Sequence, residues 1–113
     1  MIEITRKEEE IMQILWKIKR GVVWDVIKRM KKPSLHYNTV SSMVRGLETK
    51  GYLAHKAYGK THEYFPIIMK NDYKVYLINE IISNYFNSSS KELISFVINS
   101  KTLLELTTEN GKN

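Results

Sequence analysis

The apolar side chains of the first fifty residues recur at helical spacing in three short runs, and each run ends at a glycine or a proline. Apolar residues at positions i, i+3, i+4 and i+7 lie on one side of an α-helix. The stops stand at Gly21, Pro33 and Gly51. Because the stops are so closely spaced, the sequence predicts three short helices that share one core, over residues 5–20, 23–32 and 37–50.

Capping residues locate one of these helix ends and leave another without a marker. Thr5 and Glu8 have the spacing of a capping box, so the first helix is expected to start there. No Ser, Thr, Asp or Asn directly precedes Val23. We therefore expect Gly21 to end the first helix and to lead into the second.

Two runs of β-forming residues come next, at 52–57 and 62–68, on either side of a turn that contains glycine. Gly59 and Lys60 suit the two-residue loop of a β-hairpin. This loop sets the register, and the opposed side chains are then Lys56 with Glu63 and His55 with Tyr64. The sequence therefore predicts a small hairpin after the three helices.

Helical spacing returns at Asn71 and continues, with a break at 87–90, to about residue 98. The helix before the break has apolar side chains on two sides, and on a chain this small one side is best buried against a second copy. The residues assigned to dimerisation are Val75, Ile78, Ile82, Tyr85, Leu93 and Val97. The tail from Leu103 to Asn113 becomes polar, and its disorder is left open.

The middle of the chain is strongly basic. From Lys17 to Lys60 it contains 11 lysines and arginines and only 2 acidic residues, Asp25 and Glu48. Such an excess favours an anionic partner, with nucleic acid ahead of a membrane surface. A solvated basic face without any partner is the plainer alternative.

The helix predicted at 37–50 has a polar face with short side chains. At 100° per residue, five residues fall within about 100° of one another, opposite the apolar stripe: Asn38, Ser41, Ser42, Arg45 and Thr49. Short side chains let a helix approach a DNA groove, and Asn or Arg can form paired hydrogen bonds with adenine or guanine. We therefore predict that this helix reads bases in the major groove.

The order of elements, three helices and then a hairpin, is that of a winged helix-turn-helix domain. The expected fold class is mainly α with a small β-hairpin wing, followed by a C-terminal helical dimerisation segment. We place a DNA-binding domain at 1–70 and the dimerisation region at 71–113. The predicted contacts of the wing and its surroundings with the DNA backbone are Tyr37, Lys50, Lys56, Gly59 and Lys60. For Tyr37, packing on the second helix is an equal alternative.

Aromatic and histidine side chains are interpreted as structural. Trp16 and Trp24 lie beside apolar stripes, so we expect both in the core rather than against bases. His55 and His62 invite a metal site, but strand alternation is expected to direct them to opposite faces of the hairpin. We therefore predict no metal site.

Several classes of protein are excluded. The chain has no cysteine, which rules out disulfides, thiolate zinc sites and a cysteine nucleophile. No glycine-rich phosphate loop or metal-binding helix motif is present, so we expect neither an enzyme nor a cofactor. No apolar run approaches the ~20 residues of a membrane span, and the first ten residues do not form a signal core. A cytoplasmic protein is the expectation.

Tyr37-Asn38-Thr39-Val40 is followed at a fixed distance by Leu47-Glu48-Thr49-Lys50-Gly51, and then by a wing rich in tyrosine. With these motifs the chain resembles the penicillinase and methicillin-resistance repressor family, BlaI/MecI/CopY. The resemblance covers residues 4 to about 98, and its segments are 5–16, 35–40, 47–53 and 59–66. The Leu-Glu-x-Lys-Gly segment also occurs in other winged helices.

The resemblance implies a dimeric repressor that binds promoter dyads and, in several members, is removed when a membrane sensor triggers its proteolysis. The matching contacts are Asn38, Thr39, Ser42 and Arg45 on the recognition helix and Gly59 and Lys60 at the wing tip. Members inactivated by proteolysis are cut in the C-terminal region before a Phe, and here Ser95–Phe96 stands where the family pattern has an Asn–Phe bond. The copper-responsive branch has a cysteine-rich C-terminal hook, which this chain lacks.

These observations predict a sequence-specific DNA-binding transcriptional repressor that binds a palindromic operator as a homodimer. Its partners would be double-stranded operator DNA, a second copy of the chain and, by the resemblance, a membrane sensor and protease pathway that relieves repression. The alternatives are a winged helix used for protein–protein contact and a sequence-independent DNA-binding protein. The salt dependence of DNA binding separates the first alternative from the other two readings.

Overall fold

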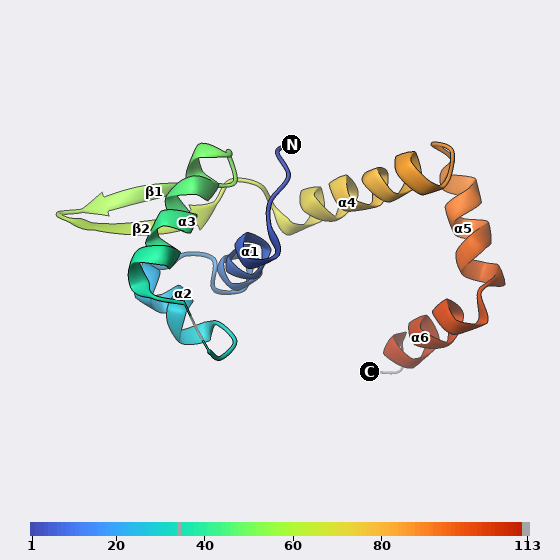
Figure 1. Ribbon diagram of the computed structural model, residues 1–113, viewed down its shortest axis with the longest axis horizontal. Coiled ribbons are helices and arrows are strands. Elements are labelled where there is room, and N and C mark those ends of the chain that lie inside the picture. Colours follow the sequence, from blue (N-terminus) through green and yellow to red (C-terminus); the bar gives the residue numbers. More distant parts are fainter. Residues whose placement is uncertain (34, 112–113) are drawn as a thin grey trace. The chain divides into compact units, whose positions relative to one another are not determined.

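The computed structural model describes residues 1–33 and 35–111, and the chain divides into two compact units, Met1–Tyr73 and Lys74–Asn113 (Figure 1). Eight elements follow one another along the described residues. They are α1 (Arg6–Ile18), α2 (Val23–Arg29), α3 (Tyr37–Thr49), β1 (Leu53–Tyr58), β2 (Thr61–Pro66), α4 (Lys70–Tyr85), α5 (Ser90–Asn99) and α6 (Lys101–Gly111). The order of three helices and a hairpin confirms the predicted fold class.

The three N-terminal helices bury the apolar stripes that predicted them. The side chains exposed by less than 2% come from all three helices and from the start of the hairpin: Ile11, Met12, Leu15, Val26, Val40, Val44, Leu47, Tyr52 and Leu53. Burial of this much apolar surface stabilises short helices that would be marginal alone. The core of the first unit therefore lies where α1, α2 and α3 meet the base of the hairpin.

The first helix starts as predicted. Thr5 is its N-cap, and the Thr5 hydroxyl accepts a hydrogen bond from the Glu8 N–H at 3.1 Å. The Glu8 carboxylate in turn accepts from the Thr5 N–H at 2.8 Å. Both bonds of the capping box are therefore present, and they satisfy two N–H groups at the helix start.

The role predicted for Gly21 is wrong. Helix α1 ends earlier, at a C-cap formed by Lys19 with a φ of 76°, and α2 is preceded by Val22, whose N–H donates to Asp25 Oδ2 at 2.9 Å. Gly21 instead pairs with Tyr64 of β2 through two backbone hydrogen bonds of 2.9 and 2.8 Å. A Cβ atom at Gly21 would lie 2.9 Å from Ile18 Cδ1 and 3.1 Å from Asp25 Cβ, so a larger residue here would press on these two side chains.

The hairpin has the predicted register. Strands β1 and β2 are antiparallel, with Lys56 opposite Glu63 and His55 opposite Tyr64. Gly59 in the loop has a φ of 62°, a conformation that glycine adopts without the strain of a side chain. The strand bounds differ from the predicted ones by one or two residues because both strands continue up to the loop.

The first turn of α4 belongs to the first unit. Tyr73 is only 5% exposed, and its ring lies 5.4 Å from that of Trp16. The Tyr73 hydroxyl donates to Glu9 Oε2 at 2.7 Å, and the Trp16 indole N–H donates to Ile68 O at 2.8 Å. These contacts join the chain that follows the hairpin to α1, and they confirm the packing role predicted for Trp16.

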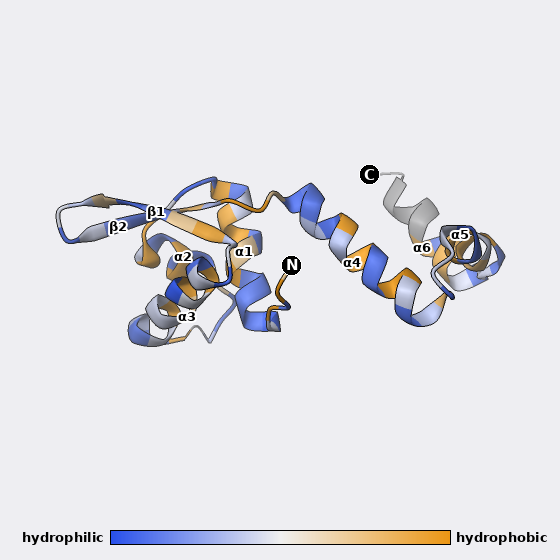
Figure 2. Cartoon of the chain, turned by 90° about the horizontal axis from the view of Figure 1, so that it is seen from above, coloured by the Kyte–Doolittle hydropathy of each residue, from blue (hydrophilic) through white to orange (hydrophobic). Residues whose placement is uncertain are grey.

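The second unit consists of α5, α6 and the part of α4 that follows Tyr73. Many of its apolar side chains are exposed. Figure 2 shows hydrophobic and hydrophilic residues alternating along α4. The exposed ones include Val75, Ile78, Tyr85, Ile94 and Ile98. Helix α6 covers Lys101–Gly111 and so includes most of the tail from Leu103, whose order the sequence left open; residues 112 and 113 lie outside the described residues.

Within the described residues, no helix combines the length and the apolar character needed to cross a membrane.

Candidate nucleic-acid interface

Helix α3 separates an inner apolar side from an outer polar side. Val40, Val44 and Leu47 are buried on the inner side. The outer side chains predicted to contact bases are exposed, except that Ser41 is half-buried; they are Asn38, Thr39, Ser41, Ser42 and Arg45. The helix therefore presents amide, hydroxyl and guanidinium groups to the outside, which are the groups that hydrogen-bond to base edges.

Arg45 is held along the helix by hydroxyl side chains. Its Nη1 donates to Ser41 Oγ at 2.8 Å, and the Thr49 hydroxyl donates to the Arg45 carbonyl at 3.1 Å. In the part of the chain that the structure describes, Arg45 forms no ion pair. Its remaining N–H donors are therefore available for an external acceptor.

The hairpin, called the wing from here on, carries two exposed lysines. Lys56 lies on β1 with its Nζ 5.4 Å from the centre of the Tyr58 ring, and Lys60 lies in the loop. Gly59 is exposed beside Lys60. The wing therefore extends positive charge beyond the helices, as the sequence predicts for a contact with phosphates.

A cleft of about 460 Å³ connects α3 to the wing. It is lined by residues of both and by the start of α2: Val22, Val23, Trp24, Tyr37, Ser41, Arg45, Lys60, Thr61, His62 and Tyr64. Four of the predicted DNA contacts thus share one surface although α3 and the hairpin loop are separate in the sequence: Tyr37, Ser41, Arg45 and Lys60. Their side chains were predicted independently from helix rotation and from the hairpin loop.

Lys50 has an internal partner. Its Nζ lies 2.8 and 2.9 Å from the two carboxylate oxygens of Glu8, whose side chain is 8% exposed. Burial by itself would raise the pKa of Glu8, but the Lys50 ammonium and the Thr5 N–H together hold it below its ordinary value. This ammonium stabilises the contact of α3 with α1, and the sequence offered no signal for the pairing across 42 positions.

Trp24 is not in the core, so that prediction is wrong. It is 56% exposed, and its ring lies 4.9 Å from the ring of Tyr37, which is 41% exposed. Helix rotation contained the signal, because Val23, Val26 and Ile27 form the buried side of α2 and leave Trp24 outside it. The residue type, not its position on the helix, led to the wrong expectation.

His55 and His62 are also placed wrongly by the sequence argument. Their rings stack at 4.1 Å with an angle of 10° on one face of the wing, and His55 Nδ1 lies 2.8 Å from Glu48 Oε2. The register explains this, because His62 pairs with Ala57, which is on the same face as His55. Among the described residues, no group of three or more metal-binding side chains is arranged to hold an ion.

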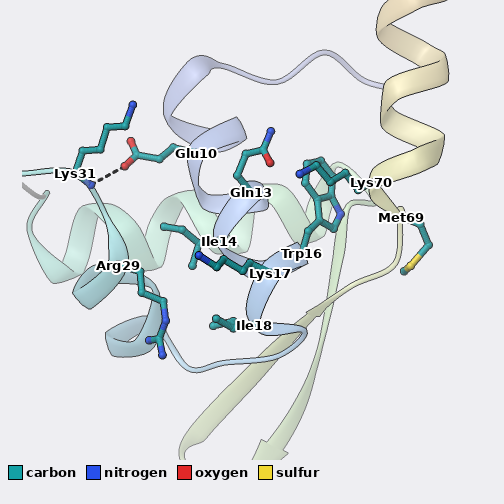
Figure 3. A pocket seen from close by; sticks show the side chains of 10 residues that line it. All are labelled: Glu10, Gln13, Ile14, Trp16, Lys17, Ile18, Arg29, Lys31, Met69 and Lys70. Atoms are coloured by element: carbon teal, nitrogen blue, oxygen red, sulfur yellow. Dashed lines mark hydrogen bonds between the residues drawn. The ribbon is translucent and has the colours of Figure 1, made fainter. Parts of the chain in front are cut away.

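A second hollow, of about 820 Å³, follows α1 on a surface that includes no residue of α3 or of the wing (Figure 3). It is lined by Glu10, Gln13, Ile14, Trp16, Lys17, Ile18, Arg29, Lys31, Met69 and Lys70. The Lys31 N–H donates to Glu10 Oε2 at 2.9 Å, and this bond holds the pKa of Glu10 below its ordinary value. This second hollow is lined by the basic residues Lys17, Arg29, Lys31 and Lys70, and it contains none of the predicted DNA contacts.

The residues assigned to dimerisation line the outside of the second unit to different degrees. Val75, Ile78 and Tyr85 are 60%, 48% and 78% exposed, whereas Ile82, Leu93 and Val97 are half-buried. Ser95 and Phe96 are exposed on α5, and the Phe96 ring lies 5.4 Å from that of Phe86.

Three comparisons with known proteins agree with one another. The model of the family described as penicillinase repressor matches residues 4–110. Over 93 residues the chain is 27% identical to a penicillinase repressor of Bacillus licheniformis, which covers 81% of this chain and 73% of that protein. A solution structure of the DNA-binding domain of the repressor BlaI superposes with a TM-score of 0.55 and 33% identity, covering 63% of this chain and 88% of that one.

Proposed function

The chain belongs to the penicillinase repressor family, and from this membership we propose that it is a sequence-specific transcriptional repressor that binds a palindromic operator as a homodimer. The relatives named above are repressors and not enzymes. The observation that carries the proposal is the exposed, donor-rich outer face of α3, which shares a basic cleft with the wing. We assign DNA binding to residues 1–70 and dimerisation to residues 71–113.

In this proposal α3 enters the major groove and reads bases. Asn38 and Arg45 have the side chains that form paired hydrogen bonds with adenine and guanine, respectively. Thr39, Ser41 and Ser42 add short hydroxyl groups that let the helix approach the base edges. The freedom of Arg45 from any described carboxylate supports its role, because a salt bridge would compete with the base.

The wing and the start of α3 would position the protein on the DNA backbone. Lys56 and Lys60 supply charge, the glycine at position 59 allows a close approach, and Tyr37 supplies a hydroxyl. Lys50 was predicted for the same role, but a contact of its ammonium with phosphate would compete with Glu8. We therefore expect Lys50 to contribute less to DNA binding than Lys60.

A homodimer would cover the exposed apolar side chains of the second unit. Val75, Ile78 and Tyr85 expose large apolar groups that a single copy leaves in water. Burying such surface in a two-fold interface is favourable, and a two-fold dimer matches a palindromic operator with half-sites about 34–36 Å apart.

Relief of repression is proposed to follow the route that the family resemblance implies, through a membrane sensor and a protease. The Ser95–Phe96 bond is the candidate cleavage site, and both side chains are exposed. Because the bond lies inside α5, local opening of that helix would have to precede cleavage. Cutting there would separate Leu93 from Val97 and thereby divide the dimerisation residues.

Selection from a random-sequence pool of DNA duplexes, at low and near-physiological salt, tests the proposal. We expect a two-fold symmetric motif whose affinity falls steeply as the salt concentration rises. Arg45→Ala should weaken binding by roughly 1–3 kcal/mol and relax base preference at one position, whereas Lys60→Ala should weaken all sequences alike.

Two results would contradict the proposal. Binding without sequence preference would favour a sequence-independent DNA-binding protein. Absence of DNA binding at either salt concentration would favour a winged helix that contacts protein.

A further inference from the structure

An exposed tryptophan of α2 packs against an exposed tyrosine at the start of α3, with their rings tilted by 37°. Trp24 and Tyr37 are 56% and 41% exposed, and their ring centres are 4.9 Å apart. Aromatic side chains of this size contribute most to stability when they are buried, so the first unit gains little from keeping Trp24 outside. The exposed pair therefore requires an explanation other than core packing.

The indole N–H of Trp24 is a donor without a described protein acceptor. Within the described part of the chain it donates to no protein atom, whereas the equivalent group of Trp16 donates to Ile68 O at 2.8 Å. An indole offers one donor and no acceptor. A polar ligand group at the Trp24 indole can therefore accept a hydrogen bond from it but cannot donate one.

The cleft that contains Trp24 is built from donors. Its polar lining groups are the indole of Trp24, the hydroxyls of Tyr37, Ser41, Thr61 and Tyr64, the charged groups of Arg45 and Lys60, and the His62 ring. None of the described residues that line it is acidic, while two other hollows of the first unit contain Glu10 and Glu63, respectively. A cleft with many donors and no carboxylate is suited to an anion that has several acceptor oxygens.

We propose that this cleft holds a backbone phosphate of the DNA strand that passes between α3 and the wing, and that Trp24 is a DNA contact, with its N–H donating to the phosphate. The inference rests on the proposed function, since it requires DNA on α3. Tyr37 would support the indole by stacking and add its hydroxyl to the same strand. The pair thus fixes the position of α3 relative to the backbone without reading a base.

Fluorescence of the full chain provides the first test. Trp16 and Trp24 are the two tryptophans, so the difference between wild type and Trp24→Phe isolates the signal of Trp24. We expect a DNA duplex to change the Trp24 signal. Inorganic phosphate in about tenfold molar excess should leave the signal unchanged, because a free ion lacks the several further contacts that a DNA strand makes with the protein. A change with inorganic phosphate alone would assign the cleft to a free anion and overturn its assignment to DNA.

Affinity provides the second test, with a duplex recovered by selection and a scrambled duplex of the same length. Trp24→Ala should weaken binding to both about tenfold, and Trp24→Phe, which keeps a ring for stacking, about threefold. Because the indole is uncharged, the slope of log affinity against log salt should not change, whereas Lys60→Ala should reduce it by about 1. Phe65→Ala removes another exposed aromatic side chain, one outside this cleft, and serves as the matched control.

The outcomes separate this inference from the proposed function. Wild-type affinity in Trp24→Ala, together with an unchanged Trp24 signal on duplexes that do bind, would overturn the role of Trp24 and leave the repressor function standing. Failure of the wild-type chain to bind either duplex would overturn the proposed function and the phosphate contact with it. Circular dichroism of each variant shows whether an affinity loss reflects unfolding. If Trp24→Ala does not fold, the affinity of Trp24→Phe and the fluorescence difference between it and the wild type remain decisive.

Discussion

Replacing Lys50 by methionine should destabilise the first unit by about 2 kcal/mol, because it leaves the Glu8 carboxylate buried without its cation. The two side chains connect the end of α3 to α1 over 2.8 and 2.9 Å. The Glu8 side chain is 8% exposed and that of Lys50 is 30% exposed. The pair is therefore shielded on the carboxylate side and open to water on the ammonium side.

The magnitude follows from this asymmetry. Removing one partner of a fully buried pair costs about 3–5 kcal/mol, because a charge remains in a poorly solvated place. Here water can reach the site of the lost ammonium, and the Thr5 N–H still donates to Glu8 at 2.8 Å. The expected loss of stability is therefore below that range, at about 2 kcal/mol. Glu8→Gln should cost about 1 kcal/mol, since Lys50 can then turn to solvent. The double variant should also lose only about 1 kcal/mol, because it has no unpaired charge.

Acidification should reduce the difference between wild type and Lys50→Met. In the wild type the pKa of Glu8 is below its ordinary value, so the stability that this carboxylate contributes is present above the unfolded pKa and is lost as the pH falls through the folded pKa. In Lys50→Met, burial is expected to raise the pKa of Glu8, and protonation then removes the unfavourable charge. The difference should therefore begin to shrink at the raised pKa of the variant, above the ordinary value of about 4.3, and should go on shrinking until the pH has fallen through the lowered wild-type pKa.

Urea unfolding followed by tryptophan fluorescence measures these values, since both tryptophans lie in the first unit. Lys28→Met, which removes an exposed lysine from α2, is the matched control and should change stability by less than about 0.5 kcal/mol. A loss below about 0.5 kcal/mol for Lys50→Met at neutral pH, or a difference that does not shrink on acidification, would refute the reasoning.

Other perturbations address the core, the helix end, the start of α4 and the dimer. Leu15→Ala, at a fully buried position, should cost about 3 kcal/mol in urea unfolding. Gly51→Ala should cost about 1 kcal/mol because the φ of 85° strains any side chain, and an unchanged midpoint would argue against that strain. Tyr73→Phe removes the bond to Glu9 and should cost about 1 kcal/mol, measured in the same assay. Ile78→Asp should convert a homodimer into monomers in sedimentation velocity, and a persistent dimer would show that the interface lies elsewhere.

Local patterns predicted the secondary structure of the first unit well. The three apolar stripes identified α1, α2 and α3, and the glycine-containing loop identified the register of the wing. Both predictions depend on periodicities of a few residues, which the backbone geometry of a helix or a hairpin imposes whatever the rest of the chain does. The polar face of α3 followed from the same helix rotation.

The histidine pair shows how a local rule fails when it is applied across a turn. Counting residues along the chain from His55 to His62 treats the hairpin as one continuous strand and places the rings on opposite faces. In the antiparallel register, directly opposed residues share a face, so His62 and Ala57 are on the same side as His55. The information was in the predicted register, and the error came from ignoring the chain reversal.

Other placements depended on residues far apart in the sequence. Lys50 is one of several lysines on the basic segment, and only the folded chain brings it to Glu8, 42 positions earlier. Gly21 resembles a helix end in the sequence, but its backbone pairs with that of Tyr64 in β2, and a side chain at this position would press on Ile18 and Asp25. The residues next to Lys50 and Gly21 in the sequence indicate neither the Lys50–Glu8 contact nor the pairing of Gly21 with Tyr64.

Helix spacing, hairpin register and the outward face of α3 could thus be derived from the order of residues alone, because hydrogen bonds and side-chain directions repeat over short distances. Which lysine turns inward, which glycine accepts a neighbouring strand, and which aromatic residue joins the cleft beside the wing were decided only when distant segments packed together. These choices set the chemistry of the surface that we assign to DNA, and they depend on contacts whose partners the local sequence does not specify.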